Sequence, residues 1–508
     1  MKGRALFFSA LLGIAIGVLS VLILEGIGRK NRLLRVSEED WRKLNLILQT
    51  VDENYVDSVD REKVTEAAVA AALAALDPHS VYMPPRQLEE AEEGLSGNFS
   101  GIGIQFNVPN DTAIVIEVIP GGPAEKIGMQ AGDRLLLVDT TVIAGVHFPQ
   151  DSMVRRIKGP TGTPVVVTVL RGRERIPFVM KRGRIPTHSV DAAFMVSDTT
   201  GYLRLGKFSR TTCSEVSRAA RDLQKAGMRE LVLDLRGNSG GYFDQAFSLA
   251  DLFLRKNAPI VYMEGRHRER ETYEASGKGF LQDIGLKVLI DDSTASSSEI
   301  FAGAIQDNRR GLLVGRRTFG KGLVQEPVNF TDGSGIRITV ARFYTPSGRC
   351  IQKPYGADYN YEVYARYGNG EMVDADSMKV EKGGILPDVF VPLDTTRVGA
   401  FYQACNRKAV PMRFASAYFD AHRAALQAID DYPSLQRYLR GADLERHFLE
   451  FARTQENLTP DAHWPREKAY MLTQVRALVS RYTKLGDNAY FHVYLDIDEC
   501  FKHALTAR

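Results

Sequence analysis

The sequence has few cysteines and histidines and little net charge. Its four cysteines, at positions 213, 350, 405 and 500, lack Cys-x-x-Cys spacing, which argues against a zinc site and a disulfide framework. Its nine histidines form no His-Glu-x-x-His motif, so we expect no metal. A net charge of +3 is too small to indicate a nucleic-acid partner. The sequence shows no internal repeat and no long low-complexity tract.

A long apolar run lies near the N-terminus. Lys2 and Arg4 precede about 23 mainly apolar residues, 5 to 27, which is long enough to span a bilayer. No Ala-x-Ala cleavage site follows, so we predict that residues 1–28 are an uncleaved membrane anchor rather than a removed signal peptide. Basic residues flank the run on both sides, so the charge pattern does not decide its orientation.

A serine stands at the start of a predicted helix in the segment 294–325. Ser296 and Glu299 form a Ser-x-x-Glu capping box, and a mainly apolar run follows from residue 300 to 305. The free N–H groups and positive dipole end of such a helix stabilise negative charge, including the oxyanion of acyl transfer. A capping box alone more often marks a simple N-cap, so this pattern leaves both roles open.

A lysine between two glycines follows this serine by 25 positions, since 321 − 296 = 25. To act as a general base, Lys321 must lose its proton near neutral pH. Its ordinary pKa of about 10.4 would have to fall by roughly three units, which burial in an apolar site can supply. The flanking glycines allow another backbone to approach closely. Without further evidence, a lysine in a surface turn is the commoner case.

A glycine-rich turn forms a second candidate block. Residues 230–236 are predicted to be a buried strand, residues 237–241 (Gly-Asn-Ser-Gly-Gly) a turn, and residues 242–254 a helix. Such a unit can offer backbone N–H groups to an anion. No Gly-Lys-Ser/Thr follows, which argues against a phosphate loop of the Walker type. Two interpretations stay open. The turn is either an ordinary strand-to-helix turn, or an oxyanion hole formed by Gly240 or Gly241 together with the N–H of Ser297.

The segment 294–325 resembles the carboxy-terminal processing peptidases, or tail-specific proteases. Their motif is close to Ser-Ala-Ser-Ala-Ser-Glu-Ile, then Gln-Asp, then Val-Gly-x-x-Thr-Phe-Gly-Lys-Gly-x-Val-Gln. The resemblance implies that Ser296 is the nucleophile, Lys321 the general base and Gln325 the residue that orients the lysine. It implies supporting roles at Glu299, Asp307 and Thr318, and its similar glycine block favours the oxyanion hole. On a straight strand Gln325 would lie about 13 Å from Lys321, so its role requires a bend.

Residues 96–183 resemble a PDZ domain. Phe99-Ser-Gly-Ile-Gly-Ile is similar to the loop and strand that bind a peptide carboxylate and its tail, which implies peptide binding at Gly101, Ile102, Gly103 and Ile104. The stretches 117–124 and 128–135 match further landmarks. The implied role is capture of exposed protein C-termini, with a regulatory lid as the alternative. Lys158 stands where the family usually has an arginine, and lysine lacks the bidentate fork of arginine.

The resemblance covers residues 40–392 and implies a multi-domain α/β protein. We predict an anchor or signal segment (1–28), an N-terminal helical region (36–95), the inserted PDZ domain (96–183), a crotonase/ClpP-like α/β peptidase core (184–394) and a C-terminal helical extension (395–508). Amphipathic helices are predicted at 414–439, 443–453 and 467–485. The C-terminal extension could serve in dimerisation or shield a catalytic groove, and the sequence leaves both roles open.

Three functions compete at this stage. The first is a Ser–Lys endopeptidase that acts on proteins with exposed C-terminal tails and needs no metal or cofactor. The second is a catalytically silent PDZ scaffold that recruits other envelope enzymes. The third is another acyl chemistry, such as thioester hydrolysis. The intact serine, lysine and glycine block favour the first. The resemblance further implies a bacterial envelope protein, anchored in the inner membrane with its catalytic domain in the periplasm, and leaves a homo-oligomer or an adaptor open.

Overall fold

The computed structural model describes residues 38–507 except 109–110, 357–358, 360 and 379–381. The chain forms two compact units, residues 1–76 and 77–508. The first unit contains helices α2 (Glu38–Asn54) and α3 (Arg61–Ala74), and Asp60 caps α3 by accepting the N–H of Lys63. The predicted anchor, residues 1–28, lies outside the described residues. Within the described part, no helix combines the length and apolarity that a membrane span needs.

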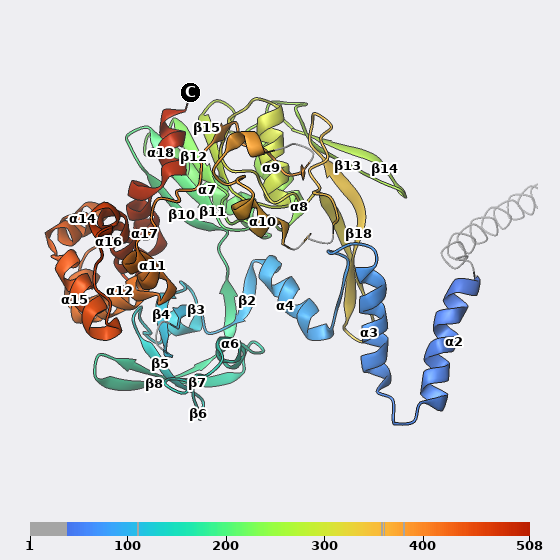
Figure 1. The fold of residues 1–508 in the computed structure, drawn as a ribbon, viewed down its shortest axis with the longest axis horizontal. Coiled ribbons are helices and arrows are strands. Elements are labelled where there is room, and N and C mark those ends of the chain that lie inside the picture. Colours follow the sequence, from blue (N-terminus) through green and yellow to red (C-terminus); the bar gives the residue numbers. More distant parts are fainter. Residues whose placement is uncertain (1–37, 109–110, 357–358, 360, 379–381, 508) are drawn as a thin grey trace, which may run out of the picture. The chain divides into compact units, whose positions relative to one another are not determined.

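The second unit is built around a six-stranded sheet with the order β10–β11–β12–β15–β16–β19 (Figure 1). Neighbours from β11 to β19 are parallel, and β10 is an antiparallel edge strand. Its inner strands are nearly continuous apolar runs, as a parallel sheet covered on both faces requires. The strands are β10 (Val190–Met195), β11 (Thr200–Leu205), β12 (Glu230–Asp234), β15 (Gly285–Ile290), β16 (Leu312–Gly315) and β19 (Val389–Phe390).

Alternate residues of the central strands face two helical layers. Leu231 and Leu233 of β12 pack in one core with α7 (Thr212–Lys225), α8 (Phe243–Asp251) and α9 (Ser297–Asp307). Val232 belongs to the core on the opposite face, with Phe501 of α18 (Glu499–Thr506). This alternation follows from the two-residue period of a strand. The predicted α/β class is therefore confirmed, and the strand–turn–helix unit at 230–254 forms as β12 and α8.

An antiparallel sheet lies beside this α/β core. Its order is β1–β18–β13–β14, and β17 also pairs with β18. β1 lies within residues 36–95, which the sequence analysis predicted to be helical, although α4 (Pro85–Ser96) follows it at once. The strands are β1 (Val81–Met83), β13 (Pro259–Gly265), β14 (Arg268–Glu274), β17 (Leu323–Asn329) and β18 (Gly335–Tyr344). β17 begins two residues after Lys321, so this sheet supports one side of the candidate site.

A separate β-domain occupies the region that resembles a PDZ domain. Its sheet has the order β3–β4–β5–β7–β8, with β6 beside β5, so that β3 is an edge strand. Two helices, α5 (Pro123–Lys126) and α6 (Gln150–Ile157), complete it, and β2 (Asn98–Gly101) pairs with β9 (Gly183–Pro186). The other strands are β3 (Ile104–Asn107), β4 (Ala113–Val118), β5 (Arg134–Val138), β6 (Thr141–Val142), β7 (Pro164–Arg171) and β8 (Glu174–Lys181).

The C-terminal region is helical and contacts both preceding domains. Ile114 and Ile116 of β4 share a hydrophobic core with these helices, and Arg423 donates to the carbonyl of Ala131 (2.7 Å). Asp498 accepts two hydrogen bonds from Arg236 at the end of β12. The predicted helix at 414–439 is divided into three. The helices are α11 (Ala400–Arg407), α12 (Val410–Ala421), α13 (Arg423–Gln427), α14 (Tyr432–Gly441), α15 (Leu444–Glu456), α16 (Trp464–Arg481), α17 (Gly486–Tyr494) and α18.

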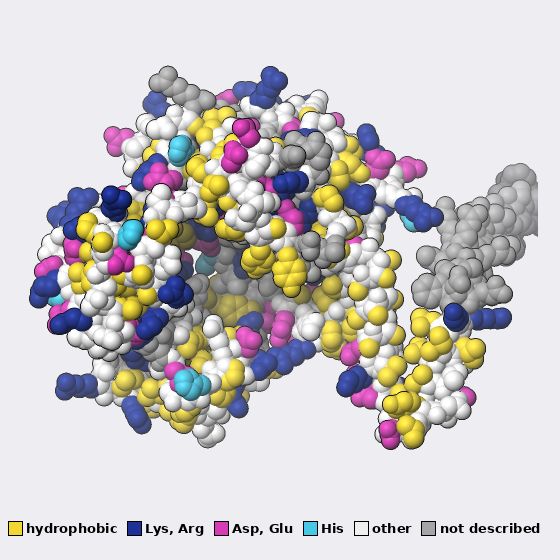
Figure 2. Space-filling view, in the orientation of Figure 1, with side chains coloured by type: hydrophobic (Ala, Val, Ile, Leu, Met, Phe, Trp, Pro, Cys, Tyr) yellow, Lys and Arg dark blue, Asp and Glu magenta, His cyan; other side chains and the backbone are white. Residues whose placement is uncertain are grey.

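The surface carries charges of both signs. On the face drawn in Figure 2, Lys and Arg side chains are interspersed with Asp and Glu side chains, in line with the small net charge. Helix α10 (Glu362–Gly368) adds exposed aromatic surface through Tyr364 and Tyr367, while Arg366 on the same helix is buried. Helix α10 therefore combines exposed aromatic side chains with a buried arginine.

Candidate active site

Ser296 lies in the turn that joins β15 to α9, directly before the first residue of the helix. Its backbone φ is +57°, a left-handed conformation that costs a non-glycine residue about 1–3 kcal/mol. The N–H of Ser296 donates to Glu299 Oε2 (2.8 Å), which is the glutamate half of the predicted capping box. This turn sets Ser296 at the positive end of α9.

The buried carboxylate of Glu299 joins the serine turn to the lysine loop. Its Oε2 accepts the N–H groups of Ser296 and Lys321, both at 2.8 Å. Its Oε1 accepts the N–H of Gly320 (2.8 Å) and the hydroxyl of Thr318 (2.5 Å). Burial raises the pKa of Glu299, whereas these four donors lower it. All four acceptor positions of the carboxylate are thus used, and it ties Ser296 and Lys321, which are 25 residues apart, into one site.

Lys321 is held close to Ser296 by this carboxylate. Because each backbone nitrogen lies 2.8 Å from the same oxygen, the two nitrogens are within 5.6 Å, twice that distance. Burial lowers the pKa of Lys321, and the positive charge of Arg337 lowers it further, while Glu299 and Asp77 oppose the shift. Among the described residues its Nζ has no hydrogen-bond partner. The amine is therefore in the environment that a lysine base needs.

Two unpaired N–H groups lie near Ser296, one in the turn at 237–241 and one at the first residue of α9. Within the described chain, the N–H groups of Gly241 and Ser297 have no hydrogen-bond partner. The N–H of Gly240 instead donates to Asn238 Oδ1 (2.9 Å), so Gly240 cannot serve as the expected oxyanion donor. Position 240 requires a glycine for a different reason, because a Cβ there would lie 2.8 Å from the Cβ of Ser296. Gly241 and Ser297 are thus the donors that this geometry leaves for an oxyanion.

Asn238 is a site residue that the sequence analysis did not single out. Its side chain is buried, donates to the carbonyl of Leu205 (2.8 Å) and accepts the N–H of Gly240. Its carbonyl accepts the N–H of Ala295 (3.0 Å) and the hydroxyl of Ser298 (3.0 Å). Asn238 therefore joins the glycine turn to both sides of Ser296. Its place inside the Gly-Asn-Ser-Gly-Gly turn was the available signal.

Gln325 has a hydrogen-bond partner other than Lys321. The pairing of β17 with β18 shifts register between Val324 and Gln325, and the Gln325 amide donates to the carbonyl of His79 (2.6 Å). No hydrogen bond joins Gln325 to Lys321 in the part of the chain that the structure describes. The geometry therefore does not support direct orientation of Lys321 by Gln325. Gln325 instead anchors the loop that contains His79.

The loop at 77–80 borders the lysine, since His79 lies within electrostatic reach of Lys321. Asp77 accepts the N–H groups of His79 and Ser80, each at 2.7 Å, and His79 Nε2 bonds with the hydroxyl of Tyr359. Burial, together with the charge of Lys321, lowers the pKa of His79 to about 4. The imidazole is consequently neutral at physiological pH, which leaves Lys321, whose pKa burial lowers, as the candidate base.

The remaining supporting residues divide into near and distant ones. Thr318 belongs to the site, since its hydroxyl donates to Glu299 and accepts the N–H of Ile385 (2.7 Å). Asp307 ends α9, about 15 Å along the helix from its first residue. There it accepts the N–H of Ser347 (2.8 Å) and pairs with Arg349. Asp307 thus holds a turn at the opposite end of the helix rather than the reacting groups.

The predicted peptide-binding residues lie between β2 and β3. Ile102 is buried, and its carbonyl accepts the N–H of Ala124 (2.8 Å) at the start of α5. The carbonyl of Gly103, where φ is +84°, accepts the N–H of Ile119 (2.9 Å). Gly101 ends β2 and Ile104 begins the edge strand β3. A free sheet edge after a glycine turn can add a peptide as a further strand.

Comparison with known proteins identifies the class. Residues 199–363 match peptidase family S41, residues 91–170 match the PDZ domain, and residues 24–86 match the N-terminal domain of the activating protease CtpB. A probable CtpA-like serine protease of Staphylococcus haemolyticus is 31% identical over 350 residues, which cover 68% of this chain and 70% of that protein. The chain therefore belongs to the S41 serine peptidases, within the C-terminal processing peptidases.

Further relatives show the same likeness. A probable CtpA-like serine protease of Staphylococcus epidermidis is 32% identical over 326 residues, and the match spans 64% of this chain and 65% of that relative's length. Among solved structures, the photosystem II D1 C-terminal processing protease is 29% identical, with a TM-score of 0.40 over 70% of this chain and 87% of that chain. None of these comparisons supports the catalytically silent scaffold.

Proposed function

We propose that the chain is a serine endopeptidase that cleaves proteins near or from their C-terminal ends, with Ser296 as nucleophile and Lys321 as general base. The observation that carries this proposal is the Glu299 carboxylate, which binds the backbones of both residues beside two unpaired N–H groups. Membership of family S41 and the serine protease relatives support the reaction class.

The reaction follows from this arrangement. Ser296 Oγ attacks the scissile carbonyl carbon while the neutral Nζ of Lys321 takes its proton. The N–H groups of Gly241 and Ser297 bind the oxyanion of the tetrahedral intermediate. The Lys321 ammonium then protonates the leaving amine, and a water molecule, deprotonated by the same lysine, hydrolyses the acyl-enzyme. The described residues contain no group of metal-binding side chains, and none of these steps needs one.

The PDZ domain supplies the substrate class in this proposal. Its edge strand β3 and the preceding Gly101–Gly103 turn suit an extended peptide that ends in a free carboxylate. Lys158 stands where the family usually has an arginine. Its Nζ lies 3.5 Å from Oε2 of Glu93 and over the ring of Phe99, next to this turn. Proteins with an exposed, unfolded C-terminal tail are the substrates that such a domain would deliver.

The test is the pH dependence of cleavage of an unfolded reporter with an apolar C-terminal tail. Because deprotonated Lys321 is the active form, kcat/KM should rise with pH through the pKa of Lys321, which lies below the ordinary value of about 10.4. His79 cannot produce this rise, because its pKa is about 4. The same tail ending in a carboxamide should be cleaved more slowly. A profile that is flat from about pH 6 to about pH 9, with chemistry rate-limiting, would contradict the lysine base.

We also propose that the enzyme is tethered to the inner membrane of a bacterium with its catalytic domain in the periplasm. The apolar run at residues 5–27 supports the membrane tether. The family resemblance supports the periplasmic side of the membrane as the location of the catalytic domain. External protease added to spheroplasts should therefore digest the catalytic domain. Protection of that domain until the membrane is permeabilised would place it in the cytoplasm and overturn the proposal.

A further inference from the structure

Arg366 of α10 is a buried arginine whose guanidinium binds the backbone of the loop that leads to Lys321. Its side chain is 1% exposed, the burial of a core residue. Nη1 donates to the carbonyls of Arg317 (3.2 Å) and Thr318 (2.9 Å), and Nη2 donates to the carbonyl of Phe319 (3.1 Å). Three successive carbonyls of the loop are thus fixed by one side chain.

The carboxylate of Glu362 sets the orientation of this guanidinium. It accepts from Nε (2.9 Å) and Nη2 (2.8 Å) of Arg366, one helical turn away, and from Nη2 of Arg317 (2.7 Å). Burial raises the pKa of Glu362, but hydrogen bonds and charge from the two arginines outweigh it and lower the pKa to about 2, so the group stays ionised. Such a bidentate pair fixes the plane of a guanidinium as well as its position.

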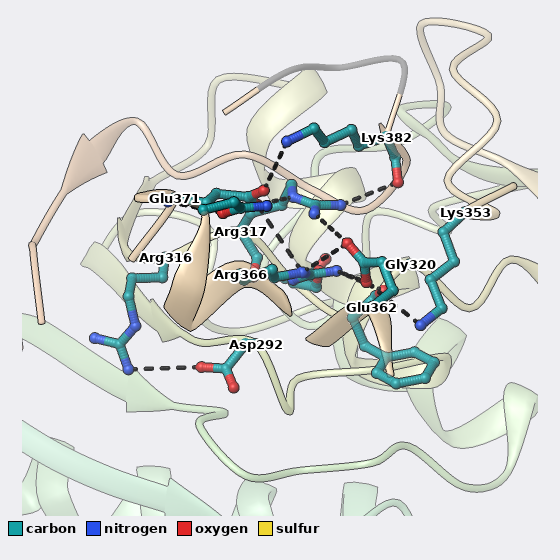
Figure 3. A network of polar contacts seen from close by, with 12 residues as sticks. Asp292, Arg316, Arg317, Gly320, Lys353, Glu362, Arg366, Glu371 and Lys382 are labelled. Carbon is teal, nitrogen blue, oxygen red and sulfur yellow. Dashed lines mark hydrogen bonds and ion pairs between the residues drawn. The ribbon is translucent and has the colours of Figure 1, made fainter. Parts of the chain in front are cut away.

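The surrounding network has more cations than carboxylates (Figure 3). Four basic side chains share two carboxylates, Glu362 and Glu371; the basic residues are Arg317, Lys353, Arg366 and Lys382. Buried guanidinium donors without an anion need other acceptors. The loop carbonyls of residues 317–319 meet that need for Arg366.

The loop before Lys321 is therefore held from two sides. Arg366 binds the carbonyls of residues 317–319, and the Glu299 carboxylate binds the N–H groups of Gly320 and Lys321. We propose that Arg366 is a positioning residue that holds the loop carrying Lys321 in its working geometry. The inference rests on the proposed role of Lys321 for its catalytic meaning. A displacement of about 1 Å at a reacting group can lower the rate about 100-fold.

The test compares Arg366→Ala and Arg366→Lys with a matched control, Arg310→Ala. Arg310 also donates to three backbone carbonyls, those of Phe253, Leu281 and Ile284, but in segments outside the site. Hydrogen–deuterium exchange at the amides of residues 317–321 is measured first, because it needs no turnover. The reporter kcat is measured next, with and without millimolar guanidinium, which can occupy the space that the alanine variant leaves.

We expect faster exchange at residues 317–321 in both Arg366 variants and unchanged exchange there in Arg310→Ala. The kcat should fall about 100-fold in Arg366→Ala, with partial recovery by guanidinium, and should also fall in Arg366→Lys, since lysine cannot span three carbonyls. Arg366→Lys keeps the charge, so it decides the matter if the alanine variant does not fold. Parental exchange and kcat in folded Arg366→Lys would overturn the inference. If the parent cuts no reporter, the endopeptidase proposal fails, while the exchange result still decides the positioning.

Discussion

Ser296→Ala and Lys321→Ala should each lower kcat by about 10⁶-fold, the loss typical of removing a serine-peptidase nucleophile or its base. Without Ser296 no acyl-enzyme can form. Without Lys321 the hydroxyl keeps its proton and the leaving amine receives none. Both variants should remain folded, because among the described residues the Ser296 side chain makes no capping hydrogen bond and the Lys321 ammonium has no hydrogen-bond partner. The measurement is single-turnover cleavage of the tailed reporter, with thermal unfolding to confirm the fold.

The double variant separates a dyad from two independent effects. If Lys321 acts only through Ser296, Ser296→Ala/Lys321→Ala should be no slower than either single variant. Lys287→Ala and Ser480→Ala are suitable controls. Lys287 is a buried lysine paired with Glu230 (3.3 Å), and Ser480 is a buried serine that bonds the carbonyl of Arg476 (2.8 Å). Both should keep the parental kcat. Multiplicative losses in the double variant would show that the two residues do not act as a unit.

Glu299→Gln should lower kcat about 100-fold and also destabilise the protein. A glutamine has one acceptor oxygen, whereas the structure directs three N–H groups and one hydroxyl at the two oxygens of Glu299. In the best orientation the amide oxygen of the glutamine still accepts the N–H groups of Ser296 and Lys321. Its NH₂ group then faces the N–H of Gly320, which loses its acceptor. An unpaired buried donor costs about 1–3 kcal/mol. The resulting shift of the lysine loop accounts for the lost rate. Denaturant unfolding and reporter kinetics measure the two effects.

Glu467→Gln is the matched control for this substitution. Glu467 is also buried, but its Oε1 accepts the N–H of Gly399 (2.8 Å) and its Oε2 has no partner in the described structure. A glutamine amide therefore fits there without meeting another donor. Its kcat should equal that of the parent. If Glu299→Gln behaves in the same way, the carboxylate is not the link between the serine turn and the lysine loop.

The sequence predicted the local parts of the site better than the long-range ones. The Ser296–Glu299 pair is a capping box, and the structure contains its glutamate half because that contact depends only on residues three apart. The other three bonds of Glu299 reach residues 318–321, and no periodic pattern indicates them. Only the likeness to a family linked the serine with the lysine.

Two predicted roles depended on backbone details that residue types do not reveal. Gly240 was expected to donate to an oxyanion, but the neighbouring Asn238 side chain takes its N–H. Gln325 was expected to orient Lys321, but its amide N–H group, next to a register shift in β17, donates to the carbonyl of His79. Strand β1 escaped prediction for a similar reason, since three residues carry too little pattern and its partner, β18, lies about 250 residues away.

The helices after residue 399 have a consequence for the evolution of this architecture. Ile114 and Ile116 of β4 share a buried core with residues of α11–α16, so one face of the PDZ domain is an intramolecular interface. Removing the helices would expose both isoleucines, and grafting a foreign domain without an equivalent apolar pair would leave the helices uncovered. Recombination of the PDZ domain alone is therefore disfavoured. The PDZ domain and the helical region are constrained to be inherited together.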